Sequence, residues 1–336
     1  MRRASHLFDS IACVENIKLA FYKAARGKRH KTVVQRFASR LDQNATSLVR
    51  DILNHRLTLG SYHQFVIRDP KERIITAPCF RERVLHHAIM NVCEPVFDSW
   101  QIFDSYACRR GKGREAAIRR AQRFSKRFEY CLKLDVRKYF DSIDHGVLIC
   151  LLSERIKDQK LMRLLASLIQ SFRVEIGCGL PIGSLTSQHF ANFYLGCLDR
   201  FIKERLGVRG YVRYMDDMIV WTDCPGSLRG THQASSTFVE NELHLKFKPS
   251  QIRPTTLGVS FLGCRVWPTH VSLNRHSKRR WSRQIRLLAR CDRLGLMTEQ
   301  ELQNRLTSLT SFSRSAGAKS WQFRRSVLNS VSVDDQ

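Results

Sequence analysis

Apolar residues recur at helical spacing in several parts of the chain. A segment from about residue 36 to 56 keeps its apolar side chains on one face, which predicts an amphipathic helix. These side chains are Phe37, Leu41, Leu48 and Ile52. A further helix is predicted from about residue 81 to 94, where Pro95 should end it because proline has no amide hydrogen to donate. Helical spacing returns near the C-terminus with Trp281, Ile285 and Leu288.

Shorter apolar runs, rich in β-branched and aromatic residues, surround three acidic residues. Residues 130–136 predict a buried strand that carries Asp135 near its end. Two more β-prone runs flank Asp216 and Asp217, so we expect a β-hairpin with both acids at its turn. These runs are residues 211–215 and 218–221. Mixed helices and an antiparallel hairpin indicate an α+β fold.

The chemistry of the three acids suggests a metal site. Carboxylates held close together in apolar surroundings are costly unless a cation binds them, and hard cations prefer oxygen ligands. Two Mg²⁺ ions held in this way clamp the attacking and leaving oxygens of a phosphoryl transfer. For Asp216 and Asp217 alone, a solvated turn is the alternative interpretation. The additional strand-end acid, Asp135, favours the metal site.

The charge of the chain points to a polyanionic partner. Its 336 residues carry a formal net charge of +27, which favours nucleic acid as a ligand. The basic residues are clustered, since residues 23–40 contain no acid and residues 275–293 contain a single one, Asp292. A charge that served only solubility would be scattered evenly.

The cysteines and the apolar runs place the chain in a reducing compartment. Eleven cysteines occur without any Cys-x-x-Cys pair, so a zinc site is not expected. Several lie in apolar surroundings and are interpreted as small buried residues, namely Cys131, Cys150, Cys197 and Cys264. No apolar run is long enough for a membrane span or a signal-peptide core. We therefore expect a cytoplasmic protein.

A glycine-rich turn offers a competing interpretation. Gly111 and Gly113 precede a basic helix predicted from about residue 114 to 127, and Asp135 follows at the distance of a ribose-binding acid. No strand is predicted before Gly111, and the turn carries arginine and lysine where a dinucleotide site relies on backbone amides. A dinucleotide-binding fold is therefore rejected.

Residues 134–140 and 214–217 resemble the two metal-binding motifs of reverse transcriptases, and ordered motifs extend over roughly residues 65–265. The resemblance implies a right-hand polymerase, with fingers, a palm built on an antiparallel sheet, and a helical thumb. It implies three domains: an N-terminal helical segment with the fingers (1–128), the palm (129–272, with about 147–178 returning to the fingers) and a basic thumb (273–336).

The same resemblance implies the roles of individual residues. Two Mg²⁺ ions, for which Mn²⁺ can substitute, would be held by Asp135, Val136, Asp216 and Asp217. The incoming nucleotide would be bound by Lys71, Arg73, Arg137, Phe140, Ile182, Gly183, Ser187 and Gln188, with Phe140 as the steric gate against a ribose 2′-OH. Template and primer would meet Arg109, Lys112, Phe261, Leu262 and Gly263, and a loose alignment makes Lys248 a candidate donor of a proton to pyrophosphate.

The segment from Gly179 to Gln188 narrows the resemblance to one subgroup. Most reverse transcriptases have Gln where this chain has Ile182, and Ser-Pro where it has Ser187-Gln188. The form found here resembles the reverse transcriptases of diversity-generating retroelements, which copy a template RNA with errors at adenines so that the cDNA rewrites a target gene. Ile182 cannot supply the hydrogen bonds of Gln, and a pocket that relies on shape alone discriminates poorly.

This subgroup implies particular partners. They are a template RNA, a cDNA/RNA hybrid, deoxynucleoside triphosphates and a small, basic, helical accessory protein that is oligomeric. Two alternatives stay open: a retron-type reverse transcriptase that makes cDNA for phage defence, and an inactive RNA-binding protein on the same fold. We expect no maturase or endonuclease segment, which argues against a group II intron protein.

Overall fold

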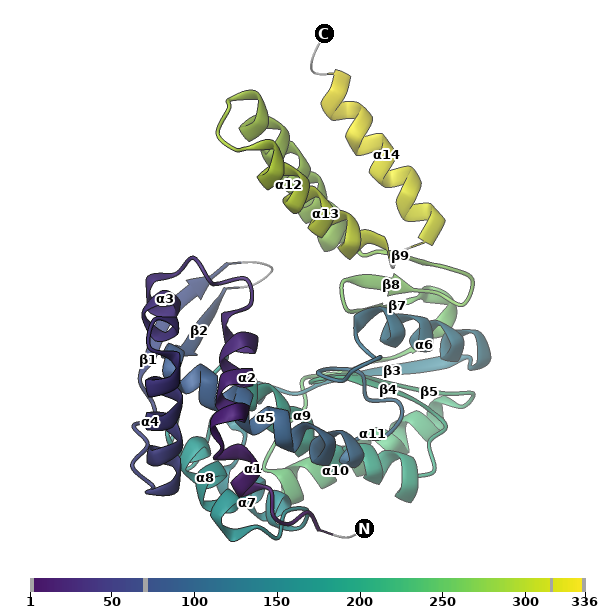
Figure 1. The fold of residues 1–336 in the computed structure, drawn as a ribbon. Coiled ribbons are helices and arrows are strands. Elements are labelled where there is room, and N and C mark those ends of the chain that lie inside the picture. The colour runs from purple at the N-terminus through teal and green to yellow at the C-terminus, as the bar shows by residue number, and fades with distance from the viewer. Residues whose placement is uncertain (1–2, 69–71, 315–316, 334–336) are drawn as a thin grey trace. The chain divides into compact units, whose positions relative to one another are not determined.

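A computed structural model describes residues 3–68, 72–314 and 317–333. The chain forms two units, each assembled from three separate stretches (Figure 1). Unit 1 comprises Met1–Phe103, Val136–Phe201 and Ala234–Lys248, and unit 2 comprises Asp104–Asp135, Ile202–Gln233 and Pro249–Gln336. The chain therefore passes back and forth between the two units. The three domains expected from the sequence are almost consecutive along the chain, and that division stays a prediction.

Unit 1 begins with helices and one two-stranded antiparallel sheet. Its first elements are α1 (Phe8–Ile11), α2 (Val14–Ala25), α3 (Thr32–Ala38), α4 (Leu41–Leu53), β1 (Tyr62–Ile67), β2 (Arg73–Pro78) and α5 (Phe80–Trp100). Helix α2 packs on α5 and α4. The strand β2 runs up to Pro78, which favours an extended backbone because the residue before a proline avoids the helical region.

Two predicted helices have different bounds in the structure. The segment 36–56 is two helices, because Arg40 leaves the helical region (φ −132°, ψ 44°) and the Asn44 side chain donates to the Phe37 carbonyl at 2.9 Å. The helix expected to stop at Pro95 continues to Trp100. Proline costs a helix about 3 kcal/mol. Burial of Phe97 and Trp100 beyond it, with the Trp100 indole donating to the Phe193 carbonyl, favours continuation.

The second stretch of unit 1 is also helical. It contains η1 (Tyr139–Ser142), α7 (His145–Ser153), α8 (Gln159–Gln170), α9 (Leu185–Tyr194) and α10 (Gly196–Arg200). Helix α9 packs against α5. Asp144 and Asp158 begin α7 and α8 as N-caps, each accepting a hydrogen bond from a backbone N–H three residues on. Asp144 also pairs with His244.

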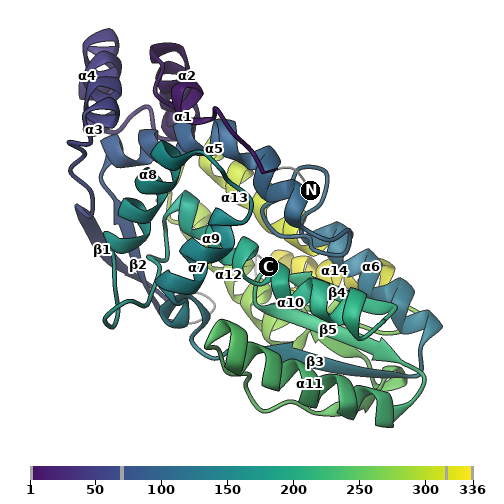
Figure 2. The same cartoon turned by 90° about the horizontal axis from the view of Figure 1, so that it is seen from below.

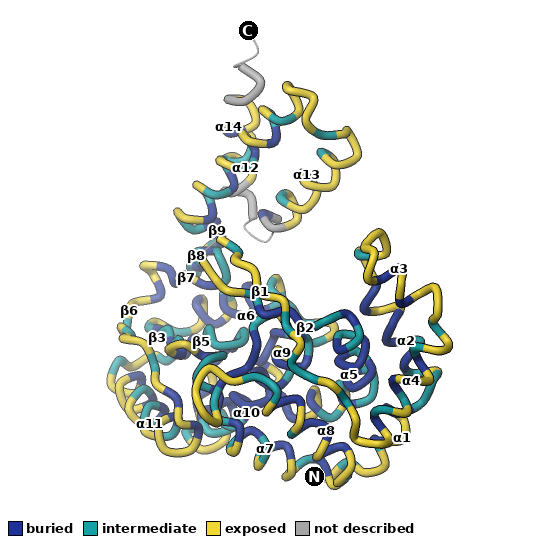
Figure 3. Tube along the Cα trace, turned by 90° about the vertical axis from the view of Figure 1, so that its left-hand side faces the viewer, coloured by how far each residue is buried: buried dark blue, intermediate teal, exposed yellow. Residues whose placement is uncertain are grey.

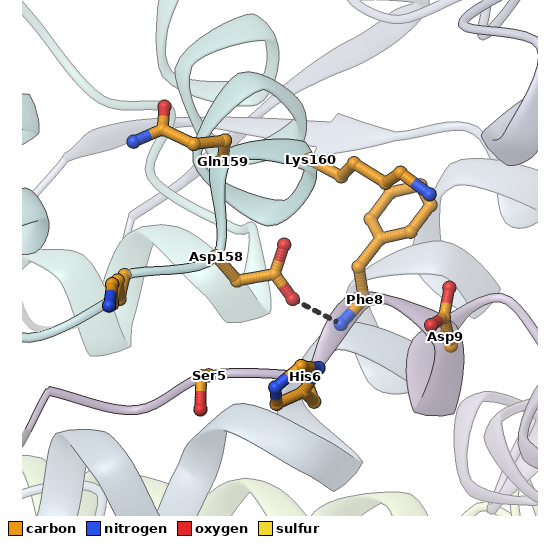
Figure 4. Close-up of a pocket in the computed structure, with 8 residues that line it drawn as sticks. Ser5, His6, Phe8, Asp9, Asp158, Gln159 and Lys160 are labelled. Carbon is orange, nitrogen blue, oxygen red and sulfur yellow. Dashed lines mark hydrogen bonds between the residues drawn. The ribbon is translucent and has the colours of Figure 1, made fainter.

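The Asp158 carboxylate also fastens the N-terminal segment to unit 1. It accepts hydrogen bonds from the backbone N–H groups of Leu7 and Phe8, both at 2.9 Å. Figure 4 shows the pocket beside it, where Phe8 and Lys160 lie close together and His6 lies below Asp158. One carboxylate thus satisfies amides at the start of two helices, α1 and α8.

Unit 2 is built around a four-stranded antiparallel sheet. Its strands, in the order β4-β5-β3-β6, are β4 (Gly210–Tyr214), β5 (Asp217–Thr222), β3 (Tyr130–Asp135) and β6 (Ile252–Pro254), and β3, β4 and β5 lie side by side in Figure 2. Helix α6 (Arg114–Arg127) buries Ala117, Ile118, Ala121 and Phe124 in one core with Val212, Ile219 and Trp221 of the sheet. Strand β3, the β4–β5 hairpin and the basic helix were predicted from the sequence, whereas β6 was not.

The rest of unit 2 is a small antiparallel sheet and three helices. The sheet is β7 (Val259–Phe261), β8 (Cys264–Val266) and β9 (Val271–Leu273), preceded by η3 (Thr255–Leu257). The helices are α12 (Arg275–Arg293), α13 (Glu299–Arg314) and α14 (Gly317–Val333). The π-helix η2 (Phe201–Arg205) and the long α11 (Pro225–Leu243) belong partly to each unit.

Helix α12 has two opposed faces, and buried and exposed residues alternate along it in Figure 3. Trp281, Ile285 and Leu288 are buried on one side. The opposite side is an arginine stripe, defined as the exposed residues Arg275, Arg279, Arg283, Arg286, Arg290 and Arg293. At 3.6 residues per turn these six positions fall within an arc of about 80°.

The burial of the cysteines agrees only in part with the sequence-based expectation. Cys150 is exposed, so the prediction that it is buried was wrong; it lies on the outer face of α7, whereas Cys131 and Cys264 are buried as expected. Cys197 is only partly buried.

Within the described residues, no helix has both the length and the apolar character that a membrane span requires.

Candidate active site

Strand pairing in unit 2 brings the three acids to one end of the sheet. Asp135 is the last residue of β3 and pairs across the sheet with Asp217, the first residue of β5. Across the hairpin, Asp217 pairs with Tyr214, so Met215 and Asp216 form the two-residue turn. The hairpin is as predicted, although only Asp216 lies within the turn itself.

The turn that carries Asp216 has an unusual backbone. Met215 has φ of +56°, a left-handed conformation that residues with a side chain adopt at a cost. Beneath it, the fully buried Arg213 donates to the Met215 carbonyl at 3.3 Å. The Arg213 backbone bonds with Asp104 and Tyr106 and so ties the hairpin to the loop before α6. Sequence reasoning missed Arg213, whose only signal is a charge inside a β-prone run.

Burial and neighbouring charges strongly perturb the carboxyl group of Asp217. Burial raises the pKa of Asp217 to about 6, the Lys133 ammonium opposes this rise, and the Asp135 and Asp216 carboxylates add to it. The Lys133 Nζ lies 3.0 Å from Oδ1 and donates to Oδ2 at 3.1 Å. The buried Oδ1 itself accepts no hydrogen bond in this geometry. Lys133 was also missed, although its position two residues before Asp135 puts it on the same face of β3.

The donor set fits a hard divalent cation. Carboxylate oxygens are its preferred ligands, and a cation would satisfy the buried Oδ1 of Asp217 and relieve the crowding of charge. In the part of the chain that the structure describes, no three His, Cys, Asp or Glu side chains converge into a preformed metal site. The side chain of Val136 is buried and apolar, which leaves only its backbone carbonyl as a possible ligand.

In unit 1, backbone hydrogen bonds join three of the segments predicted to bind a nucleotide. The Thr76 N–H donates to the Ile182 carbonyl at 2.7 Å, which fastens the Ile182 segment to β2, the strand that begins at Arg73. The Leu180 N–H donates to the Phe140 carbonyl at 2.8 Å. Arg73, Phe140 and Ile182 therefore belong to one connected framework.

Gly183 is the residue on which the close approach of these segments depends. Its φ of +126° is a conformation that L-residues rarely adopt. A Cβ there would lie 2.7 Å from the Ile75 Cγ2 and 3.1 Å from the Thr76 carbonyl oxygen. Only glycine lets the Ile182 segment run this close to β2.

The other predicted nucleotide-binding residues differ in exposure. Arg73, Arg137 and Gln188 are exposed, Phe140 and Ile182 are partly buried, and Ser187 is buried within α9. The Arg137 N–H donates to the Lys246 carbonyl, which holds the backbone next to Val136. Lys71 lies outside the described residues.

The residues predicted to meet template and primer cluster within unit 2. Leu262 and Gly263 form the turn between β7 and β8, with φ of +49° and +79°, while Phe261 is buried. The Arg114 side chain donates to the Leu262 carbonyl at 2.9 Å and joins this turn to the start of α6. In the loop before α6, Arg109 donates to the Ser105 carbonyl and Lys112 lies over the Tyr106 ring.

No extended strand leads into Gly111 in the described residues 101–113, so the rejection of a dinucleotide-binding turn is supported. The antiparallel sheet with acids at the end of its central strands, covered by helices, defines the fold as a right-hand polymerase, as predicted. A solved structure agrees: apo telomerase from Candida tropicalis superposes on 70% of this chain and 53% of its own, with a TM-score of 0.50 and 10% identity. That likeness shows the fold alone.

Residues 67–266 match the family model for reverse transcriptase (RNA-dependent DNA polymerase), and the chain belongs to this family. Among similar proteins, nuclear intron maturase 4 of Arabidopsis thaliana is 29% identical over 48% of this chain. Protein YkfC of Escherichia coli is 26% identical over 46%, and group II intron-encoded protein LtrA of Lactococcus lactis is 26% identical over 39%. The aligned regions span only 21%, 45% and 23% of these relatives.

Proposed function

We propose that this chain is an RNA-directed DNA polymerase, a nucleotidyltransferase that copies a template RNA into cDNA. The observation that carries the proposal is the β3–β5 register, which sets Asp135 opposite Asp217 beside the Asp216 turn. Asp135, Asp216 and Asp217, with the Val136 carbonyl, would hold two Mg²⁺ ions. When bound, such ions stabilise the charge on the oxygens of the reacting phosphate.

The residues of unit 1 would select and orient the nucleotide. Arg73 on β2 suits a triphosphate because a guanidinium offers several donors in a fixed plane. Phe140 would stand where a ribose 2′-OH enters, and Ile182 and Gly183 would line the nascent base pair. Template and primer would lie on Arg109, Lys112 and the Phe261–Gly263 turn.

The test of catalysis is Asp135→Asn. We expect Mg²⁺-dependent cDNA synthesis on an RNA template to be lost while RNA binding survives, since the basic clusters and not the acids supply that binding. Asp292→Asn, at an exposed position of α12, is the matched control. If Asp135→Asn makes cDNA at the wild-type rate, the proposed polymerase function is wrong.

The finer proposal is a polymerase of a diversity-generating retroelement, error-prone at template adenines and acting in mutagenic retrohoming. Its support is Ile182, which is partly buried and whose carbonyl is linked to β2. The aliphatic side chain of Ile182 can offer the base pair no hydrogen bond. The proposal includes a cytoplasmic setting, a template RNA with its cDNA hybrid, and the small, basic, helical accessory protein.

Ile182→Gln tests this subtype. The backbone link to Thr76 survives the substitution, so only the side chain changes. One buried hydrogen bond contributes about 0.5–1.5 kcal/mol, so misincorporation opposite adenine should fall roughly two- to tenfold. The measurement is cDNA sequencing on a template with all four bases, with template RNA and accessory protein present.

Ile176→Gln, at a position that is 93% exposed, is the control for introducing an amide. An unchanged error spectrum in Ile182→Gln would reduce Ile182 to a subgroup marker. A retron RNA gene beside the coding sequence, in place of paired repeats that differ at adenines, would support a retron-type enzyme instead.

A further inference from the structure

Lys133 is a charged residue in the middle of the sheet that the function described above does not use. It lies on β3 between the buried Leu132 and Leu134, and β3 has a neighbouring strand on each side. Its ammonium lies 3.0–3.1 Å from both carboxylate oxygens of Asp217. It also donates to the Ser260 carbonyl of β7 at 2.9 Å.

These contacts make Lys133 the built-in counter-ion of Asp217. Both oxygens of the carboxylate face the same ammonium, which is partly shielded from water, with 35% of its side chain exposed. The Ser260 carbonyl holds the ammonium from a second side. The pair is therefore anchored at three points, unlike the mobile ion pairs of protein surfaces.

We infer that Lys133 competes with divalent cations for Asp217, so that the acids take up a metal together with the nucleotide and bind it weakly beforehand. The inference rests on the proposed polymerase function. Mg²⁺ requires close, well-ordered oxygen ligands and is usually held by one or two carboxylates plus substrate phosphates. A lysine ammonium beside the same carboxylate donates a hydrogen bond to one of its oxygens and repels the metal ion.

The Ser260 carbonyl is a second acceptor, so the Lys133 ammonium keeps one hydrogen bond when a metal binds Asp217. A triphosphate entering with its metal adds negative charge, which offsets the loss of the Lys133–Asp217 pair. Lys133 thus acts through Asp217 as a positioning residue, and its effect should be largest when no nucleotide is present.

The test is Mn²⁺ binding to the full chain without nucleotide, followed by electron paramagnetic resonance, in wild type, Lys133→Met and Lys133→Arg. Methionine keeps the unbranched apolar stem of the side chain and removes the charge. We expect Lys133→Met to bind Mn²⁺ about tenfold more tightly, which corresponds to about 1.4 kcal/mol. Lys133→Arg should stay close to wild type, as should Lys126→Met, a control at an exposed position of α6.

Thermal unfolding distinguishes competition for the metal from a general loss of stability. Without divalent ions, Lys133→Met should unfold at a lower temperature than wild type, and added Mg²⁺ should raise its unfolding temperature by more than that of wild type. Equal or weaker Mn²⁺ binding by Lys133→Met would overturn the inference, as would an absence of binding in both proteins. If Lys133→Met binds more tightly but Asp135→Asn still makes cDNA, the proposed function fails and the competition stands.

Discussion

Phe140 lies where backbone geometry leaves little freedom. It belongs to η1, its ring meets the Tyr139 ring edge-on, and its carbonyl accepts from the Leu180 N–H at 2.8 Å. A side chain on so constrained a backbone can act as a rigid wall. A rigid wall discriminates between sugars that differ by one hydroxyl, because it cannot move aside to admit the larger one.

Phe140→Ala should therefore raise the use of ribonucleotides relative to deoxyribonucleotides, by at least about tenfold. The measurement is the ratio of kcat/KM for the two sugars on one RNA template. Phe65→Ala, at an exposed position of β1, is the control. An unchanged ratio would leave Phe140 a packing residue only.

Single residues were predictable where their chemistry conflicts with their surroundings. Asp135 and the Asp216–Asp217 pair are acids in apolar runs, and that conflict identified them. Lys133 and Arg213 are equally out of place, but their partners are the Asp217 side chain across the sheet and the Met215 carbonyl of a tight turn. Such partners become visible only once the strand register is known.

Gly183 supports a prediction at the scale of elements, because it sets how closely the Ile182 segment and β2 approach. In Gly183→Ala, the added Cβ would meet Ile75 and Thr76 and push the two segments apart. We expect stability to fall by about 1–3 kcal/mol and the KM for deoxynucleotides to rise. Both are measurable, by chemical unfolding and by steady-state kinetics.

Gly27→Ala is the matched control, since Gly27 also has a positive φ, +70°, but a Cβ there meets nothing within 4 Å. Gly27→Ala therefore places an alanine at a positive φ without a steric clash of its Cβ. If the two variants lose the same stability and keep the same KM, the close packing at Gly183 has no role in nucleotide binding.

Elements were predicted well where one period dominates the sequence, as in α6 and the β4–β5 hairpin. The failures involve competition between local and distant effects. Pro95 is a local stop signal, yet α5 continues because Phe97 and Trp100 are buried beyond it. Conversely, apolar periodicity runs through residues 36–56, yet a hydrogen bond from Asn44 to Phe37 supports a break that periodicity does not reveal.

At the scale of the molecule, the net charge of +27 predicts strongly salt-dependent RNA binding. The arginine stripe of α12 concentrates part of that charge on one exposed face. Each phosphate contact on single-stranded RNA contributes about 0.7 to the slope of log K against log salt. Replacing Arg279, Arg283 and Arg290 together by Gln should therefore lower the slope by about two.

Lysine at the same three positions is the control, because it keeps the charge and should keep the slope. Titrations of a labelled RNA between low and physiological salt measure both. A glutamine variant with the slope of wild type would show that the stripe of α12 meets no phosphate.

The interleaving of the two units has a consequence for synthesis on the ribosome. Unit 1 needs residues as late as Lys248, and the sheet of unit 2 needs β6 at Ile252–Pro254. Neither can close while only the first half of the chain has emerged. The face of α5 that packs against α9 stays uncovered until α9 has emerged, and this exposed apolar surface makes the nascent chain a substrate for chaperones.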